Sequence, residues 1–396
     1  MHLALFTGDS AIAYGKKNIF YEMLKQFSTH FERVSVICPS NEIGQEITIH
    51  ENVHLYPSGH SKFLHLDFFK HKSFIIKKAN EIHKANPIDL ITAHIIPPLF
   101  ANLKAAIKMN KTFAIPYVGE LHHVPCYPVY SNFFEWIEKI SLKIYLKINV
   151  KNIKHLRIVN RSGTLKYLRA IGFPDQKIIY IPSFYLDFEV FKPLPLVASK
   201  KTKQFVFAGR LEKNKGLNLL IEAFEIAIKN DNEIKLKIIG EGSNKTETAK
   251  LINKKKLDQN IEMLGWLPTQ KDVAKIYSES AALIMTSFNE GGPRVTLEAM
   301  ACKTLCITTK VGIMNQVVKD NENAIFIKWE AADIAEKINR TAKNPDEAKK
   351  IAERGFEDVQ QFEYHKAIKN FTDKYLKIIN NDHIKESTLK KFQAKQ

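Results

Sequence analysis

The sequence has few cysteines. The four that it has, at positions 38, 126, 302 and 306, are too few and too scattered for a disulfide framework. Cys302 and Cys306 lack the second pair of ligands that a zinc site needs, so we interpret all four cysteines as reduced and mostly packed. Reduced cysteines are typical of a cytosolic protein.

Long apolar runs and export signals are also missing. No stretch of about 18 uninterrupted apolar residues is present, which argues against a membrane-spanning helix. The first residues lead into polar Thr7-Gly8-Asp9 without a basic start or a small-residue cleavage pattern, so they do not resemble a signal peptide. We therefore expect a cytoplasmic protein, either free or peripheral on the cytoplasmic face of the inner membrane.

Acidic residues are outnumbered, since 59 Lys and Arg stand against 42 Asp and Glu and give a formal net charge of +17. Such a field favours anionic ligands, nucleic acid or an anionic membrane surface. The sequence has no zinc-finger spacing and no RNP-like aromatic motif, so we do not expect a nucleic-acid partner. A non-enzymatic protein that binds an anionic polymer stays open as an alternative.

Short apolar runs alternate with helical patterns along most of the 396 residues, which is the rhythm of a parallel sheet covered by helices. A chain of this length exceeds one hydrophobic core, so two Rossmann-like domains are the simplest interpretation. The elements that we expect include a strand at 113–118 and a helix at 296–301. We predict four regions: a first domain at 1–193, a second at 194–360, a helix at 361–380 and a basic tail at 381–396.

The most informative segment, residues 287–300, joins an apolar strand to a helix. It therefore lies at the carboxyl edge of a parallel sheet, where open α/β folds bind ligands. Gly291 and Gly292 allow the backbone to approach a ligand closely, and the helix start offers free N–H groups. Glu290 and Glu298 can each accept hydrogen bonds from sugar or ribose hydroxyls. The segment predicts a site for a hydroxylated, anionic ligand.

Two other interpretations of these glutamates stay open. A glycosidase pair is disfavoured, because eight residues of continuous helix span about 12 Å, whereas hydrolases hold their two carboxyl groups about 5 to 9.5 Å apart. The glycines make the first part of the segment non-helical, so the helical rise does not apply to all eight residues. Alternatively, Glu298 is an ordinary first-turn glutamate that the helix dipole favours.

A second loop carries two cations. Residues 205–216 predict a strand, a turn at Gly209 and the start of a helix, with Arg210 and Lys215 five residues apart. Such a loop can place a guanidinium, which binds phosphate bidentately, and an ammonium point charge on one diphosphate. Solvated loop cations are the alternative.

These motifs resemble those of a known enzyme family. The spacing of Glu290 and Glu298, within Glu-Gly-Gly-Pro and Leu-Glu-Ala-Met-Ala-Cys, is similar to the signature of the family 4 (group 1) glycosyltransferases of the GT-B fold. The resemblance covers nearly the whole chain and is strongest at 205–309. It implies two Rossmann-like α/β domains that face each other across a cleft, with a C-terminal helix packing back on the first domain. The first domain would then face the acceptor, and the second would bind the nucleotide sugar.

The resemblance also implies roles for single residues. In the second domain it assigns Glu290, Gly291 and Gly292 to the donor sugar, Glu298 to the nucleotide ribose, and Arg210 and Lys215 to the donor diphosphate. In the first domain, only Gly15 of Tyr14-Gly15-Lys16 matches the family's usual double glycine near the phosphate. His122 matches the histidine of a His-Gly pair that faces the sugar, and His123 replaces the glycine. A structural role for His122 is the alternative.

The reaction that the resemblance implies is retaining transfer of a hexose-type sugar from a UDP- or GDP-sugar, with His122 and Glu290 as catalytic residues. Same-face attack is assisted by the leaving diphosphate, so the protein supplies positioning and charge. No metal-ligand cluster or Asp-x-Asp pair stands out in the sequence. We therefore predict that transfer needs no metal and no cofactor besides the nucleotide sugar.

Two basic segments of the first domain concern the acceptor. Residues 133–154 place isoleucines at helical spacing and lysines at four-residue steps, and residues 62–78 interleave aromatic residues with cations. Such segments can lie on an anionic membrane, whereas a packed helix with a solvated lysine face is the alternative. We predict a glycan or lipid-linked acceptor, of cell-envelope polysaccharide or lipopolysaccharide type. The rival enzyme is a sucrose-synthase-like protein with a soluble acceptor.

Overall fold

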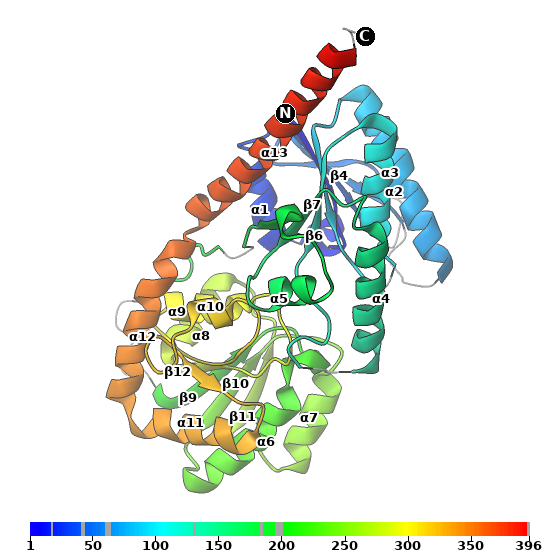
Figure 1. Cartoon of the computed structure of the whole chain (residues 1–396). Helices are drawn as coiled ribbons and strands as arrows, with labels where there is room; N and C mark the ends of the chain where they lie inside the picture. The colour runs from blue at the N-terminus through cyan, green and yellow to red at the C-terminus, as the bar shows by residue number, and fades with distance from the viewer. Residues whose placement is uncertain are drawn as a thin grey trace.

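The computed structural model describes residues 1–16, 19–40, 44–59, 65–97, 99–129, 132–182, 185–194 and 201–393. Within these ranges the side chains of 19, 65–69, 201–202 and 381–393 are not described. The chain forms two α/β domains, one above the other in Figure 1, and a long C-terminal helix that lies along the first domain.

The described part of the first domain is built on an eight-stranded sheet with the order β3-β4-β2-β1-β5-β6-β7-β8. All its neighbouring strands are parallel except β3, which is antiparallel to β4. The strands are β1 (His2–Phe6), β2 (Arg33–Cys38), β3 (Ile47–Ile49), β4 (Val53–Pro57), β5 (Leu90–His94), β6 (Tyr117–Leu121), β7 (His155–Ile158) and β8 (Ile178–Tyr180).

Alternate residues of a strand point to opposite sides of the sheet, and both sides are apolar here. Helices therefore cover both faces. Ala4 and Phe6 pack against α2 to α5, whereas Leu3 and Leu5 pack against α1 and α13. The helices are α1 (Ile19–Phe27), α2 (His65–Ala85), α3 (Ala101–Phe113), α4 (Phe133–Asn149) and α5 (Gly163–Ala170), with short 3-10 turns at Ala11–Tyr14 and Asp175–Lys177.

The second domain has a six-stranded, all-parallel sheet with the order β11-β10-β9-β12-β13-β14 in the described residues. Its strands are β9 (Lys201–Ala208), β10 (Lys235–Ile239), β11 (Ile261–Gly265), β12 (Ser280–Met285), β13 (Leu305–Thr309) and β14 (Ile325–Ile327). Its helices are α6 (Leu217–Asn230), α7 (Lys245–Lys254), α8 (Gln270–Glu279), α9 (Arg294–Ala301), α10 (Met314–Val317), α11 (Ala331–Lys343) and α12 (Pro345–Val359), with 3-10 turns η3 (Lys213–Lys215) and η4 (Gln360–Phe362).

The last helix, α13 (Tyr364–Gln393), leaves the second domain and packs on the first (Figure 1). Its Phe371 ring stacks edge-on against Phe27 of α1, with 5.3 Å between centroids. The Tyr364 hydroxyl donates to the main-chain oxygen of Glu22, also on α1. The predicted packing of a C-terminal helix on the first domain is confirmed.

The predicted end of this helix is wrong. We expected a helix at 361–380 and a tail from 381, but α13 begins at Tyr364 and its backbone stays helical to Gln393. Residues 381–393 contain neither glycine nor proline, so their polar composition does not break the helix. Residues 394–396 of the predicted tail lie outside the described residues, as do residues 195–200 next to the predicted domain boundary at 193/194.

Candidate active site

The loop between β12 and α9 carries Glu290, Gly291 and Gly292 at the carboxyl edge of the second sheet. Two donors fix its start, since Thr309 Oγ1 and Trp329 Nε1 both donate to the main-chain oxygen of Ser287, at 2.7 and 3.0 Å. The loop ends at Pro293, which caps α9. The second domain therefore fixes both ends of the loop that carries Glu290.

The cationic loop after β9 lies directly beside this one. Thr286 Oγ1 donates to the main-chain oxygen of Lys215 at 2.8 Å, and the amide of Phe288 donates to that of Asn214 at 2.8 Å. Gly216 is required at this contact, because its φ is +67° and a Cβ would lie 2.4 Å from the main-chain oxygen of Thr286. The two predicted ligand loops thus form one joined surface.

On this surface Lys215 and Glu290 form a direct ion pair through Nζ and Oε1. Their side chains are only 14% and 16% exposed, so the pair is largely shielded from solvent. Ser287 Oγ also donates to Glu290 Oε1, at 3.3 Å. The sequence placed these two residues at different parts of one ligand, and the structure brings them into contact with each other.

Glu298 lies in the second turn of α9, because that helix begins at Arg294, two residues before the predicted start. The interpretation of Glu298 as a first-turn glutamate is therefore wrong. Arg294 Nε lies 2.9 Å from Glu298 Oε1, and the Tyr277 hydroxyl donates to Oε2 at 3.4 Å. Burial raises the pKa of Glu298, and the Arg294 cation opposes the shift. Ribose binding by Glu298 stays a prediction.

His122 follows β6 of the first domain and faces the glutamate loop across the domain boundary. Its main-chain oxygen packs on Gly291, where a Cβ would come within 2.1 Å of it. Asn160 Nδ2 donates to the main-chain oxygen of Gly291 at 3.2 Å, and Ser162 Oγ donates to that of Gly312 at 2.8 Å. The glycine after Glu290 therefore permits the close approach of the two domains, a role that the sequence analysis did not assign.

The side chain of His122 contacts Glu120, which lies two residues earlier, on β6. The His122 Nε2 atom lies 3.3 Å from Glu120 Oε2. Desolvation by the surrounding protein lowers the pKa of His122 to about 4, although 41% of its side-chain surface is still exposed. The imidazole is therefore neutral at pH 7.

The remaining predicted site residues are Gly15 and Arg210, and His123 follows His122 in the chain. Gly15 ends the 3-10 turn after β1 with a φ of +71°, and Arg210 is exposed at the start of the cationic loop. Although the His123 side chain is exposed, desolvation by the surrounding protein lowers its pKa. The Arg210 and Lys215 cations act in the same direction, whereas Glu135 opposes the shift. The residue that replaces the family's glycine thus faces the predicted phosphate cations from the other domain.

Three residues that meet at Glu120 were not predicted from the sequence. Arg157 Nη1 and His94 Nε2 lie 3.0 and 3.3 Å from its Oε2 atom, and the Tyr375 hydroxyl donates to Oε1. His94 ends β5 and stands opposite Glu120 in the β5–β6 register, so strand pairing would have found it. Together His94, Glu120 and His122 are also residue types that can hold a metal ion, with ligand atoms within 4.8 Å of one another.

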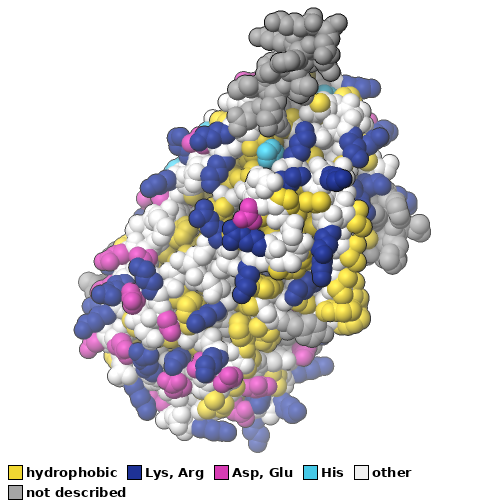
Figure 2. All heavy atoms as spheres, viewed as in Figure 1, with side chains coloured by type: hydrophobic (Ala, Val, Ile, Leu, Met, Phe, Trp, Pro, Cys, Tyr) yellow, Lys and Arg dark blue, Asp and Glu magenta, His cyan; other side chains and the backbone are white. Residues whose placement is uncertain are grey.

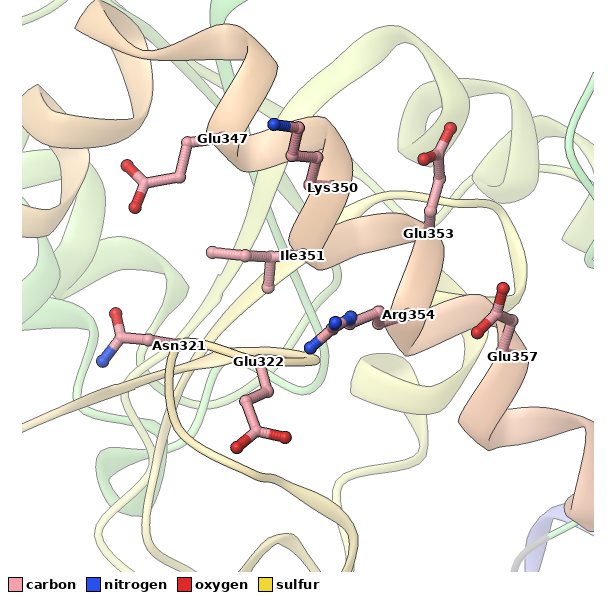
Figure 3. A pocket seen from close by; sticks show the side chains of 8 residues that line it. All are labelled: Asn321, Glu322, Glu347, Lys350, Ile351, Glu353, Arg354 and Glu357. Atoms are coloured by element: carbon pink, nitrogen blue, oxygen red, sulfur yellow. The ribbon is translucent and has the colours of Figure 1, made fainter.

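A separate pocket of about 450 Å³ lies on the second domain between α12 and the loop at Asn321 and Glu322 (Figure 3). In the close-up, Arg354 points from α12 toward that loop, and Glu347, Glu353 and Glu357 lie on the same helix. None of the predicted site residues lines this pocket. It is not part of the candidate active site.

Comparison with known proteins identifies the second domain. Residues 193–358 match the family model described as glycosyl transferases group 1. The second domain belongs to the group 1 glycosyltransferases. The chain is also 26% identical over 319 residues to the uncharacterized glycosyltransferase MJ1178 of Methanocaldococcus jannaschii. That alignment covers 77% of this chain and 80% of that protein. This chain spans only 27% and 45% of the length of the next two curated relatives that it matches.

Solved structures establish the fold of the chain over nearly its whole length. Sucrose-phosphate synthase from Thermosynechococcus elongatus superimposes with a TM-score of 0.79 at 15% identity, over 96% of this chain and 99% of that one. Anabaena Alr3699/HepE in complex with UDP-glucose gives a TM-score of 0.73 at 16% identity, over 95% and 99%. The predicted GT-B architecture is confirmed.

Proposed function

We propose that this protein is a glycosyltransferase that moves a hexose-type sugar from a UDP- or GDP-sugar to a glycan or lipid-linked acceptor, with retention of configuration. The observation that carries the proposal is the Lys215–Glu290 ion pair, on a loop whose next residue, Gly291, packs on the main chain of His122 from the other domain. A cation and a carboxylate at this domain boundary, with a neutral imidazole on the facing segment, suit a ligand with both phosphate and hydroxyl groups. HepE, which shares the fold, has been solved with UDP-glucose.

In this proposal Arg210 and Lys215 stabilise the negative charge that develops on the leaving diphosphate. Because Lys215 also contacts Glu290, one cation can touch both the diphosphate and the carboxylate that receives the sugar hydroxyls. That contact fixes the two parts of the donor relative to each other, which is how positioning lowers a barrier. His122 accepts a further hydrogen bond from the donor, and Glu298 binds the ribose.

We propose that the transfer needs no metal ion, because the two cations neutralise the diphosphate. Persistence of full activity in excess chelator is the expected result. Loss of transfer in chelator, with recovery on adding a divalent ion, would contradict this part of the proposal and would turn attention to the His94, Glu120 and His122 group.

The acceptor is proposed from the surface of α4. The isoleucines predicted as a stripe on this helix face outward, and Leu142 and Leu146 pack into the core in their place. The predicted isoleucine stripe is therefore not the side of α4 that packs on the domain. Phe134 and Ile148 are 76% and 73% exposed, and the exposed large apolar residues of the helix also include Phe133, Trp136, Ile137, Ile140 and Ile144. Figure 2 shows hydrophobic side chains gathered along the edge where α4 lies in Figure 1.

Cations accompany this apolar surface, which we call the α4 face. Lys143, Lys147 and Lys151 are exposed beside it. Apolar side chains flanked by lysines suit the interface of an anionic bilayer, where each cation contributes about 1 kcal/mol. We therefore propose a peripheral membrane enzyme on the cytoplasmic face, with a lipid-linked acceptor of the cell envelope and no nucleic-acid partner. No helix in the described residues is long and apolar enough to cross a membrane. The second basic segment, 62–78, begins outside the described residues.

The soluble-acceptor alternative has one observation in its favour, the fold shared with sucrose-phosphate synthase. That likeness concerns the fold alone. A soluble disaccharide product from a sugar or sugar-phosphate acceptor would decide for it.

The experiment that tests the proposal is a thermal-shift screen of UDP-, GDP- and ADP-sugars, followed by product analysis with the best donor. A donor present at about 100 times its Kd stabilises the native state by about 2.7 kcal/mol, which is a measurable rise in Tm. NMR of the product then gives the anomeric configuration. Stabilisation by none of the nucleotide sugars, or an inverted product, would contradict the donor or the stereochemical part respectively.

A further inference from the structure

Glu120 is a buried carboxylate with four partners from four different elements. Its Oε2 atom lies near His94 Nε2, His122 Nε2 and Arg157 Nη1, and its Oε1 atom accepts from the Tyr375 hydroxyl. Glu120, Arg157 and Tyr375 are 4%, 2% and 0% exposed. Burial alone would raise the pKa of Glu120, but Arg157 and the two histidines hold it well below its usual range. The group is therefore an acceptor only.

This fixes where the protons of both histidines lie. A neutral imidazole carries one N–H, and the nitrogen next to an ionised carboxylate must carry it to form a hydrogen bond. Both Nε2 atoms face Glu120 Oε2, so Nδ1 of each ring keeps its lone pair. His94 agrees with this assignment independently, because its Nδ1 lies 3.1 Å from the Thr7 hydroxyl and 3.5 Å from the amide of Gly8, which can only donate.

We propose that Glu120 is a positioning residue that locks His122 as the Nε2–H tautomer and so presents the Nδ1 lone pair to the cleft as a hydrogen-bond acceptor. The inference rests on the proposed function, because it says what His122 does for the donor. An acceptor cannot bind a phosphate oxygen, which has no hydrogen. His122 therefore reads a hydroxyl group of the donor sugar and not its diphosphate.

A metal ion is a weaker interpretation of the same cluster. His94, Glu120 and His122 are suitable ligand types, but the Arg157 guanidinium already occupies the same carboxylate oxygen at 3.0 Å and carries the compensating charge. Arg157 is held there from two other sides, because its Nε donates to the main-chain oxygen of Ile181 and its guanidinium lies 4.1 Å over the Phe371 ring. A divalent ion would have to displace or face this cation.

The first test reads the tautomer without any substrate. Protein labelled with ¹⁵N-histidine is studied at pH 7.5 by long-range ¹H–¹⁵N correlation, which separates Nε2–H from Nδ1–H imidazoles, and the His122→Ala variant assigns the signal. The expected result is a single Nε2–H tautomer for His122. An Nδ1–H tautomer, or a mixture of the two, would overturn the proposal. Because no donor is present, this outcome does not depend on whether the proposed function holds.

The second test removes the carboxylate. Glu120→Ala alone would leave Arg157 as an unpaired buried cation, so it is combined with Arg157→Met, which leaves no charge behind. In the double variant the His122 signal should become a mixture of tautomers, and kcat at saturating donor should fall by about 10- to 100-fold because the acceptor is no longer held in place. Nucleotide affinity should stay within about twofold.

A purely structural role for Glu120 predicts a different pattern, in which the double variant loses stability but His122 keeps its tautomer. That result would overturn the proposal.

The third test uses donor sugars that lack single hydroxyl groups. In the wild type, deoxygenation of one hydroxyl of the sugar should lower kcat/KM, and that loss should largely vanish in His122→Ala. Equal losses in both proteins at every hydroxyl would also contradict the proposal. Absence of any transfer by the wild type would instead refute the proposed function and leave the tautomer result standing.

Discussion

The hydroxyl of Tyr375, on the C-terminal helix, donates a hydrogen bond to the buried carboxylate of Glu120, which lies 255 residues earlier in the sequence. The helix that crosses from the second domain to the first is therefore part of the polar cluster behind His122. This gives α13 a role beyond covering the sheet, because it completes the set of donors around the carboxylate that contacts both His94 and His122.

We expect Tyr375→Phe to lower both stability and activity. The substitution removes one hydrogen bond to a buried charge, which contributes about 1.5–3 kcal/mol to the free energy of unfolding. Because Glu120 then loses one of its fixed partners, kcat should fall about three- to tenfold, while the Kd for the nucleotide stays unchanged. Urea unfolding and initial-rate kinetics measure the two effects.

The matched control is Tyr364→Phe on the same helix. The Tyr364 hydroxyl also bonds the first domain, but its acceptor is the main-chain oxygen of Glu22, away from Glu120. This variant should lose about 1 kcal/mol of stability and keep its kcat within about twofold. Equal losses of kcat in both variants would show that α13 acts only by holding the domains together.

The two glutamates of the second domain should fail in different ways. Glu290→Gln removes the charge that Lys215 contacts and one acceptor for sugar hydroxyls, so we expect transfer to fall by about 10²- to 10³-fold with nucleotide binding largely retained. Glu298→Ala should instead weaken nucleotide binding about tenfold, because it removes the ribose acceptor. Steady-state kinetics with the best donor and calorimetry with the free nucleotide distinguish the two.

Glu353→Gln serves as the control for these variants, because Glu353 lies on α12 in the separate pocket and should change neither quantity. Equal and negligible effects of Glu290→Gln and Glu298→Ala would overturn both assignments. A loss of nucleotide binding in Glu290→Gln as large as in Glu298→Ala would overturn the division of labour between them.

How much of this site the sequence could predict depends on how local each contact is. Glu290, Lys215 and the glycines belong to short strand–loop–helix segments, and the structure places them on adjoining loops of one sheet edge, as parallel strands require. Their direct contact was not predictable, because it depends on the side-chain conformations of two loops that lie 75 residues apart. The contact of Tyr375 with Glu120 was not predictable either, because the two residues lie far apart in the sequence and no periodic pattern links them.

Boundaries between elements were the less predictable part of the fold. The apolar run at 113–118 predicted a strand, but Phe113 ends α3, Ala114 turns with a φ of +60°, and β6 begins only at Tyr117. An apolar run by itself does not distinguish the end of a helix from the start of a strand. Similarly, α9 begins at Arg294 directly after Pro293, whose fixed φ suits a helix start, and this shifts Glu298 out of the first turn.

The stability of the enzyme should fall as the pH drops from 7 toward 4, and His2 should be one cause. His2 is 5% exposed, and its ring nitrogens lie 3.1 Å from the main-chain oxygen of Asn86 and 2.9 Å from Ser35 Oγ. Burial lowers its pKa from 6.5 to about 4, with Arg33 acting in the same direction and Asp89 opposing. The unfolded chain therefore binds a proton below pH 6.5 that the native state refuses until about pH 4.

Because the unfolded state binds this proton and the native state does not, the His2 contribution to the free energy of unfolding is about 2 kcal/mol smaller at pH 5 than at pH 8. Urea unfolding at the two pH values should show that His2→Gln reduces the pH dependence by about this amount. The exposed His30 supplies the comparison, since His30→Gln should leave the dependence as in the wild type. A slope that is identical in the wild type and in His2→Gln would contradict the prediction.

Binding to anionic membranes should depend on the α4 face. In flotation assays at low salt, we expect the protein to float with vesicles that contain anionic lipid and to stay behind with neutral ones. Replacing Lys143, Lys147 and Lys151 by glutamate should weaken partitioning by at least about 100-fold, because each cation contributes about 1 kcal/mol and charge reversal adds repulsion. Phe134→Ser combined with Ile148→Ser should also weaken partitioning, because apolar burial is lost. The apolar loss should persist at high salt, whereas the effect of the lysine changes should shrink there because charges are screened.

The matched control is the replacement of Lys343, Lys349 and Lys350 in the second domain by glutamate. This triple variant changes the net charge equally and should leave flotation intact. If both triple variants lose binding to the same extent, net charge and not the α4 face controls the association, and the membrane part of the proposal fails.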